Sequence, residues 1–267
     1  MAGILNVQLH SAIGKKNVNF RKVEHYIKVN HHKGLDLVVL PEFFATNNDY
    51  IESFEPQDGG EVLDFIKTLA KKYNVNVVAG SVACKQATKM YNTTFAVNRN
   101  GDVIAKYNKI HLNKFFGCNE GEKFTAGNEI VIAEFDFAKV GIALGFDVRF
   151  PAHFNKLARS GCDIIAFPCA WYIPQEVADN ENSLKIAQEM WTSICKTRAY
   201  DNMVYLVVSN QTKDALNNLY GIGKSTIIAP TGEIISSLNL EECGIYANID
   251  IDGLKYYRQL CPIIAID

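Results

Sequence analysis

Long apolar segments are missing from the sequence: no run of about 18 consecutive apolar residues occurs, which excludes a membrane-spanning helix. The sequence also lacks a block of basic residues, and its net charge is -2. Nucleic acid is therefore not expected as the main partner. Neither linker composition nor a low-complexity segment appears, so we expect residues 1–267 to form a single domain.

No Cys-x-x-Cys pair is present, although the chain has seven cysteines. The segment Met1–His10 lacks a charged region followed by an apolar stretch, so we expect a first strand there rather than a signal peptide. These features predict a cytoplasmic protein with mostly buried, unreactive thiols. The adjacent His31 and His32 do not have metal-ligand spacing, so we expect them at a solvated helix end, with a metal site as the weaker alternative.

Apolar periodicity predicts alternating strands and helices along the whole chain. Helices are expected at 17–32, 61–72, 151–160 and 183–202, with Gly34 ending the first of them. Short apolar segments predict strands at 4–9, 36–40, 75–82, 91–97, 103–107, 130–135, 140–144, 163–167, 204–209, 224–228, 233–237 and 246–249. In the longest helix the buried face is expected to carry Ala187, Met190, Ile194 and Ala199. The pattern predicts an α/β fold.

The segment 140–151 has the features of a buried strand that runs into a sharp turn. Residues 140–144 are apolar and partly β-branched, and Gly145 allows the backbone to bend or to approach another group closely. Asp147 and Arg149 follow at once, and Pro151 opens the next helix. Because α/β proteins bind ligands at the carboxyl ends of their strands, we expect chemistry here.

Glu42 also follows a predicted strand, beside Phe43 and Phe44. Partial desolvation would raise the pKa of its carboxyl group toward that of a useful general base. A carboxylate that caps the next turn is an equally good interpretation of the spacing alone. Lys109 follows a strand as well, and a lysine at such a position is more often a solvated surface charge.

The turn segment resembles the nucleophile segment of the nitrilase superfamily, the carbon–nitrogen hydrolases. The family pattern Cys-Tyr/Trp-Asp-x-Arg-Phe-Pro-Glu corresponds here to Gly145-Phe146-Asp147-Val148-Arg149-Phe150-Pro151-Ala152. Glycine therefore stands where the resemblance implies the nucleophilic cysteine. Hydrolysis through a thioester at position 145 is closed on this alignment, because glycine has no thiolate.

Further motifs extend the resemblance over nearly the whole chain. It implies a four-layer α-β-β-α sandwich, with Glu42 of Pro-Glu as general base and Lys109 of Tyr-x-Lys-x-His-Leu as the cation that stabilises the oxyanion. His111 is then expected to be structural, hydrogen-bonded rather than bound to a metal. The resemblance also implies a second catalytic glutamate upstream of Thr125-Ala-Gly127. We prefer Glu122 for this role, and Glu120 is then expected to line the substrate site.

The segment Pro168-Cys-Ala-Trp171 resembles the family segment beside the nucleophile, and residues 198–202 match its Arg-Ala-x-x-Asn helix end. Phe146, Cys169 and Trp171 are accordingly expected to contact substrate. A relocated nucleophile at Cys169 is a weaker alternative, because buried cysteines are usually inert. Asp147 and Arg149 are expected to form an ion pair that holds the turn. The resemblance also implies a homodimer or larger homo-oligomer, and neither it nor the residues imply a metal or an organic cofactor.

Three functions stay open on this sequence. The first is an amidase-type hydrolase that acts on or binds a small carboxamide or carbamoyl compound, inactivated at Gly145 or working without a thiol. The second is a non-catalytic protein that keeps the pocket to bind a ligand or regulate a partner, in which Glu42 and Lys109 persist as an ion pair. The third is a different thiol-independent reaction in the same pocket.

Overall fold

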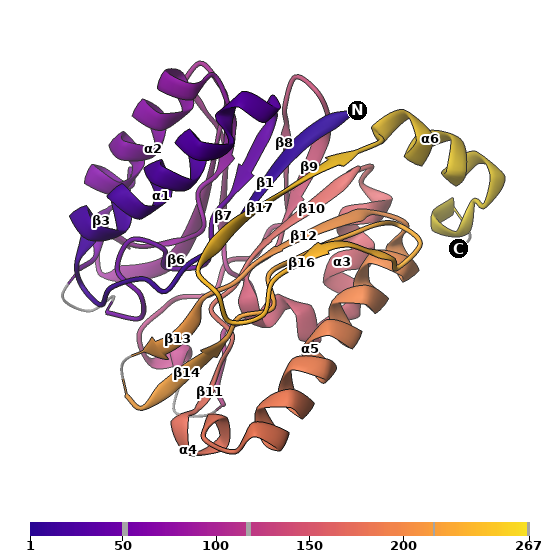
Figure 1. Ribbon diagram of the computed structural model, residues 1–267. Helices are drawn as coiled ribbons and strands as arrows, with labels where there is room; N and C mark the ends of the chain where they lie inside the picture. The colour runs from indigo at the N-terminus through magenta and orange to yellow at the C-terminus, as the bar shows by residue number, and fades with distance from the viewer. Residues whose placement is uncertain (50–52, 116–118, 216, 266–267) are drawn as a thin grey trace.

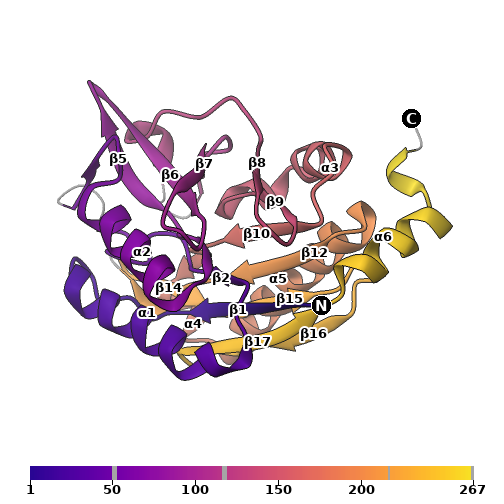
Figure 2. The same ribbon diagram turned by 90° about the horizontal axis from the view of Figure 1, so that it is seen from above.

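Two large β-sheets pack face to face between two outer layers of helices in the computed structural model, which describes residues 1–49, 53–115, 119–215 and 217–265 (Figures 1 and 2). The predicted α/β class and four-layer sandwich are confirmed. Within these residues no helix is long and apolar enough to cross a membrane.

The described residues form two main sheets and one small sheet. The first has the order β17 (Cys243–Ile249), β1 (Ala2–Gln8), β2 (Leu37–Val39), β4 (Asn76–Val78), β6 (Lys89–Val97), β5 (Val82–Gln86) and β3 (Glu55–Pro56), with β7 (Val103–Asn108) also paired to β6. The second has the order β16 (Ile234–Ser237), β15 (Thr226–Ile228), β12 (Tyr205–Ser209), β10 (Ile164–Pro168), β9 (Lys139–Ile142) and β8 (Val131–Glu134). The small sheet contains β11 (Tyr172–Pro174), β14 (Leu219–Ile222) and β13 (Thr212–Ala215).

Helices cover the outer face of each main sheet. The first sheet is covered by α1 (Lys16–Asn30) and α2 (Gly60–Tyr73), and the second by α3 (Pro151–Arg159) and α5 (Glu181–Asn202) (Figure 1). Two further helices, α4 (Gln175–Ala178) and α6 (Ile251–Leu260), lie near the small sheet and near the C-terminal end respectively.

Alternating side chains along the strands build three apolar layers. In β1, Leu5 and Val7 pack toward α1 and α2, whereas Ile4 packs between the two sheets. In β10, Ile164 faces the other sheet and Ile165 faces α3 and α5. Successive side chains of a strand point to opposite faces, so strands buried on both faces must be apolar throughout.

Parallel pairing brings several strand ends to one region. β1, β2 and β4 run parallel in the first sheet, as do β9, β10 and β12 in the second. Glu42 follows β2, and its backbone N–H donates to the carbonyl of Cys169, which follows β10, at 3.2 Å. This bond joins the two sheets where the candidate site forms.

Two expectations about the elements were wrong in detail. Residues 75–82 do not form one strand, because Gly80 has φ +54 and turns the chain out of β4 before it enters β5. In α5 the buried face carries Trp191, Cys195 and Ala199, while Met190 is 66% exposed. The apolar stripe is therefore rotated by one residue from the predicted one.

Candidate active site

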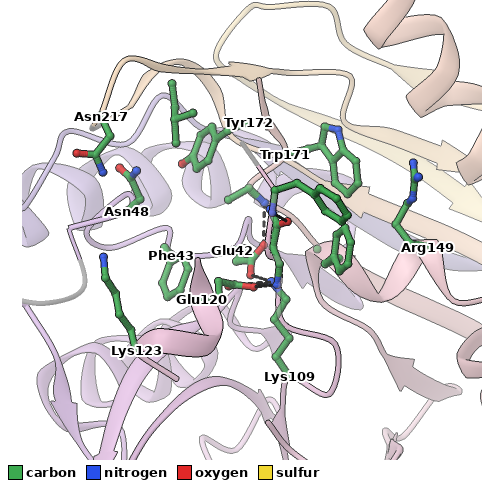
Figure 3. Close-up of a pocket in the computed structure, with 16 residues that line it drawn as sticks. Glu42, Phe43, Asn48, Lys109, Glu120, Lys123, Arg149, Trp171, Tyr172 and Asn217 are labelled. Atoms are coloured by element: carbon green, nitrogen blue, oxygen red, sulfur yellow. Dashed lines mark hydrogen bonds and ion pairs between the residues drawn. The ribbon is translucent and has the colours of Figure 1, made fainter. Parts of the chain in front are cut away.

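A buried ionic cluster lies at the edge where the strand ends meet. Lys109 Nζ is 2.8 Å from Glu42 Oε1 and 2.9 Å from Glu120 Oε2, and none of the three side chains is more than 7% exposed. Figure 3 shows both carboxylates directed at the amine. The structure thus brings Glu42 and Lys109 together in one buried cluster.

Each member of the cluster is held by a different local structure. Glu42 is carried by the turn after β2, and Lys109 follows β7, where its backbone N–H donates to the carbonyl of Asn92 at 2.9 Å. Glu120 begins a short 3₁₀ turn, Glu120–Glu122, and its carboxylate accepts a hydrogen bond from the backbone N–H of Asn113 at 2.6 Å. The loop is thus closed onto the carboxylate that reaches Lys109.

Asn92 is a member of the cluster that the sequence analysis did not identify. Its side-chain amide, on β6, donates to Glu42 Oε1 at 2.7 Å and to Glu120 Oε1 at 3.3 Å. Asn92 is fully buried, between Tyr91 and Thr93 of β6. The signal in the sequence was an asparagine within a predicted strand, because a polar side chain that is buried there needs hydrogen-bond partners.

Burial and the neighbouring charges shift the pKa values of Glu42 and Lys109. Burial raises the pKa of Glu42, partly offset by the charge of Lys109 and increased again by Glu120. Burial alone would lower the pKa of Lys109, but the charges of Glu120 and Glu42 outweigh it and raise that pKa. Lys109 is therefore the stable cation, and Glu42 accepts a proton more readily than a solvated glutamate does.

Gly145 lies directly beside the ionic cluster. It has φ +40, and a Cβ atom built on it would lie 2.4 Å from Glu42 Oε2 and 3.1 Å from Lys109 Nζ. The same Glu42 oxygen accepts a hydrogen bond from the backbone N–H of Ala170 at 3.0 Å. The carboxylate thus occupies the space that a side chain at position 145 would need.

A cavity of about 250 Å³ opens onto the cluster. It is lined by Glu42, Phe43, Asn48, Lys109, Asn113, Phe115, Glu120, Lys123, Gly145, Phe146, Arg149, Ala170, Trp171, Tyr172, Asn217 and Leu219. The rings of Phe146 and Trp171 stack with centroids 6.4 Å apart and form one wall. Arg149 and Lys123 lie on opposite sides of the cavity (Figure 3). The lining therefore combines an apolar wall with cations.

Two residues that the sequence predicts at the site, Glu122 and Cys169, lie outside the cavity. Glu122, preferred there as the second glutamate, is exposed and bonds to Asn119, whereas Glu120 reaches Lys109, because the 3₁₀ turn directs the first of the two inward. Cys169 does not line the cavity; its thiol donates to the carbonyl of Phe167 in the core. Burial raises the pKa of the Cys169 thiol well above its usual value, so it is held as an inert thiol.

The expected ion pair between Asp147 and Arg149 does not form. Asp147 is fully buried, where it accepts hydrogen bonds from the Tyr107 hydroxyl at 2.6 Å and the backbone N–H of Leu144 at 2.8 Å, and lies 2.7 Å from His111 Nδ1. Arg149 is exposed and lines the cavity instead, because alternate positions of the 3₁₀ turn face different sides. The carboxylate of Asp147 also accepts a hydrogen bond from the backbone N–H of His111 at 3.1 Å.

The sequence profile of the carbon–nitrogen hydrolases matches residues 6–259. The fold, the buried glutamate–lysine–glutamate cluster and the cavity agree with this class of protein. The chain belongs to the carbon–nitrogen hydrolase family. It is 29% identical to the 2-oxoglutaramate amidase of Bacillus subtilis (strain 168), over 96% of this chain and 94% of that protein. It is 30% identical to a protein of Staphylococcus aureus named "Hydrolase in agr operon", over 96% of this chain and 94% of that one.

A solved structure with a similar fold is that of Saccharomyces cerevisiae Nit3, a member of branch 10 of the nitrilase superfamily. It has a TM-score of 0.83 and 25% identity, and the match covers 98% of this chain and 94% of that one. Together with the family profile, these relatives make the chain an amidase-like member of the family.

Proposed function

We propose that this protein binds a small carboxamide or carbamoyl compound in the cavity at Glu42, Lys109 and Glu120, and that the thioester route of its family is closed. One observation carries the proposal: Glu42 Oε2 lies 2.4 Å from where the Cβ of residue 145 would be. On the family resemblance Gly145 holds the position of the nucleophilic cysteine. The base therefore fills the volume from which the thiol would attack.

The lining supports a ligand with an amide at one end and a carboxylate at the other. Lys109 offers a cation to an amide or carbamoyl oxygen, and the carboxylate of Glu42 offers an acceptor to the amide N–H groups. Arg149, at the cavity wall, offers a planar donor set that matches a carboxylate. The Bacillus subtilis relative is named as an amidase of 2-oxoglutaramate. A monoamide of a dicarboxylic acid is accordingly the ligand class we assign.

Thiol-independent hydrolysis in the same cavity is the second candidate, favoured by the raised pKa of buried Glu42. Glu42 would take a proton from water, the resulting hydroxyl oxygen would attack the amide carbon, and Lys109 would stabilise the oxyanion. Collapse would break the C–N bond, and the proton held by Glu42 would leave with the ammonia. No thiol takes part in this sequence.

Ammonia release and ligand binding separate the two candidates. Wild type and Gly145→Cys are incubated with dicarboxylic monoamides, carbamoyl amines and simple amides, and binding to wild type is measured by calorimetry. Binding without ammonia release by wild type is the expected result, and release by Gly145→Cys alone would support the missing thiol as its cause. Release by wild type that persists in Cys169→Ala would replace our proposal with the second candidate, and release abolished by Cys169→Ala would revive the relocated nucleophile.

We also infer that the chain forms a homo-oligomer, as its family resemblance implies. The outer face of α5 supports this, because Ile186, Met190 and Tyr200 are each more than half exposed. Light scattering of the purified protein tests the inference, and a monomer at micromolar concentration would reject it.

A further inference from the structure

Three side chains with metal-ligating atoms meet on the far side of the turn that carries Gly145. His111 follows β7, Asp147 lies in the 3₁₀ turn Gly145–Arg149, and His153 lies in α3. One ligand atom from each residue lies within 4.8 Å of those of the other two. The side chains of Asp147 and His153 are 0% and 2% exposed, whereas that of His111 is 23% exposed.

His153 Nε2 has no hydrogen-bond partner among the described residues, although it is fully buried. The imidazole also bonds to the backbone of Ile142, which leaves Nε2 free to present a lone pair. Nε2 faces Asp147 Oδ2 at 4.0 Å, too far for a hydrogen bond. A buried polar atom without a partner destabilises the folded protein, so its presence beside a carboxylate requires an explanation.

The surroundings hold the two other groups in fixed orientations. Asp147 is held by the Tyr107 hydroxyl and the Leu144 backbone N–H. The His111 ring stacks on that of Phe150 with centroids 3.7 Å apart. Hydrogen bonds and packing of this kind around ligating side chains are what orients them in metal sites.

We propose that His111, Asp147 and His153 bind a divalent transition-metal ion, for which Zn²⁺ is the best match. Two imidazoles and one carboxylate are ligands that Zn²⁺ takes with one position left over. His111 Nδ1 and Asp147 Oδ1 are 2.7 Å apart. The ion would replace the proton between these two atoms, which would have to separate by about 0.6 Å to hold it. A tetrahedral Zn²⁺ holds its ligand atoms about 3.3 Å from one another, so His153 Nε2 has to approach by on the order of 1 Å.

A second cavity, of about 530 Å³, gives access to this cluster from solvent. His111, His153 and Ala152 line it together with Glu129 and Lys156. The small side chain of Ala152 leaves its wall open where the family resemblance implies a glutamate. The ion would tie the strand end that carries Lys109 to the turn of Gly145 and to α3, so its role would be structural.

Metal titration of the purified chain, stripped with a chelator, tests this site. Zn²⁺ is titrated against a chromophoric chelator, and Co²⁺ is added separately to record its absorption spectrum. We expect one ion per chain, a Co²⁺ spectrum without thiolate charge-transfer bands, and a rise in the melting temperature on adding Zn²⁺. His153→Leu fills the buried position with an apolar side chain that cannot bind a metal. It is expected to weaken Zn²⁺ binding by at least about 100-fold.

The exposed pair His31 and His32 supplies the matched control. Replacing both with alanine is expected to leave the affinity and the stoichiometry unchanged. Loss of binding in this control, thiolate bands with Co²⁺, or equal affinity in wild type and His153→Leu would each overturn the proposal. His111→Phe preserves the stacking on Phe150 and serves as a second ligand variant; should His153→Leu fail to fold, unweakened binding by His111→Phe would overturn it as well.

Discussion

The carboxylate of Glu42 occupies the space beside Gly145: a Cβ at residue 145 would lie 2.4 Å from Glu42 Oε2. Three donors hold the carboxylate there, namely the Lys109 amine, the Asn92 amide and the Ala170 backbone N–H. Any side chain at position 145 must therefore displace a buried, fully bonded group. The position of the Glu42 carboxylate therefore depends on the absence of a side chain at residue 145.

Gly145→Ala is accordingly expected to destabilise the protein by about 2–4 kcal/mol, from the strain of φ +40 and the displaced carboxylate. Gly161→Ala is the matched control, since Gly161 has φ +88 and no atom within 4 Å of a built Cβ. The control should lose only about 1 kcal/mol. Urea unfolding of both variants gives the comparison, and equal losses would show that the contact with Glu42 has no energetic weight.

Lys109→Met is expected to destabilise the protein by about 3–5 kcal/mol, because it leaves two buried carboxylates without a cation. Lys139→Met serves as the control. Lys139 is 51% exposed and pairs with Glu134, which is 72% exposed, so its replacement should leave the stability close to that of wild type. Chemical denaturation at neutral pH measures both. A loss below 1 kcal/mol for Lys109→Met would contradict the charge balance described for the cluster.

The sequence predicted the architecture well because its signals are local and repeated. Apolar strands followed by amphipathic helices lead to layered sheets, and short turns placed Glu42, Lys109 and Gly145 at strand ends. The second glutamate was misassigned because Glu120 and Glu122 differ only in which side of a 3₁₀ turn they face. That orientation depends on the bond from the Asn113 backbone to Glu120, which spacing does not encode.

Long-range contacts were beyond the sequence for a related reason. Asn92 and Glu42 are 50 residues apart and meet only when β6 and the turn after β2 come together in one sheet. The helix α6 was also missed, although Asp250 caps it by accepting a hydrogen bond from the Gly253 backbone. The small sheet of β11, β13 and β14 was not predicted either, since its strands have only three or four residues each.

Replacing the two neighbouring glutamates separately tests the corrected assignment. Glu120→Gln removes a charge that Lys109 and the Asn113 backbone share, so we expect a loss of stability of about 1–3 kcal/mol. Glu122→Gln alters an exposed carboxylate and is expected to stay within about 0.5 kcal/mol of wild type. Thermal and urea unfolding measure the two variants. The reverse order would restore Glu122 as the residue that matters.

The pH dependence of stability is expected to contain a contribution from Glu42. Burial raises the pKa of Glu42 above the usual 4.5. At pH values between 4.5 and the raised pKa, the folded protein therefore retains a proton that the unfolded chain has released. Stability from this group is thus full below pH 4.5 and declines as the pH rises through the raised pKa. Glu42→Gln cannot titrate, so its stability relative to wild type should rise over this range. Urea midpoints measured across the range test the slope, and parallel profiles would contradict it.

Arg149 provides the most direct test of the ligand class. Its guanidinium lies at the cavity wall without a salt bridge among the described residues, so it is available to a carboxylate on the ligand. Arg149→Gln is expected to weaken binding of a dicarboxylic monoamide by roughly three- to tenfold, since an exposed charge pair contributes about 1 kcal/mol. Binding of a simple amide without a carboxylate should change little, because that ligand reaches only the Lys109 end. Calorimetry with both ligands measures the effect, and Lys139→Gln is a distant control for a general loss of positive charge. Equal weakening for the two ligands would place the ligand carboxylate elsewhere in the cavity.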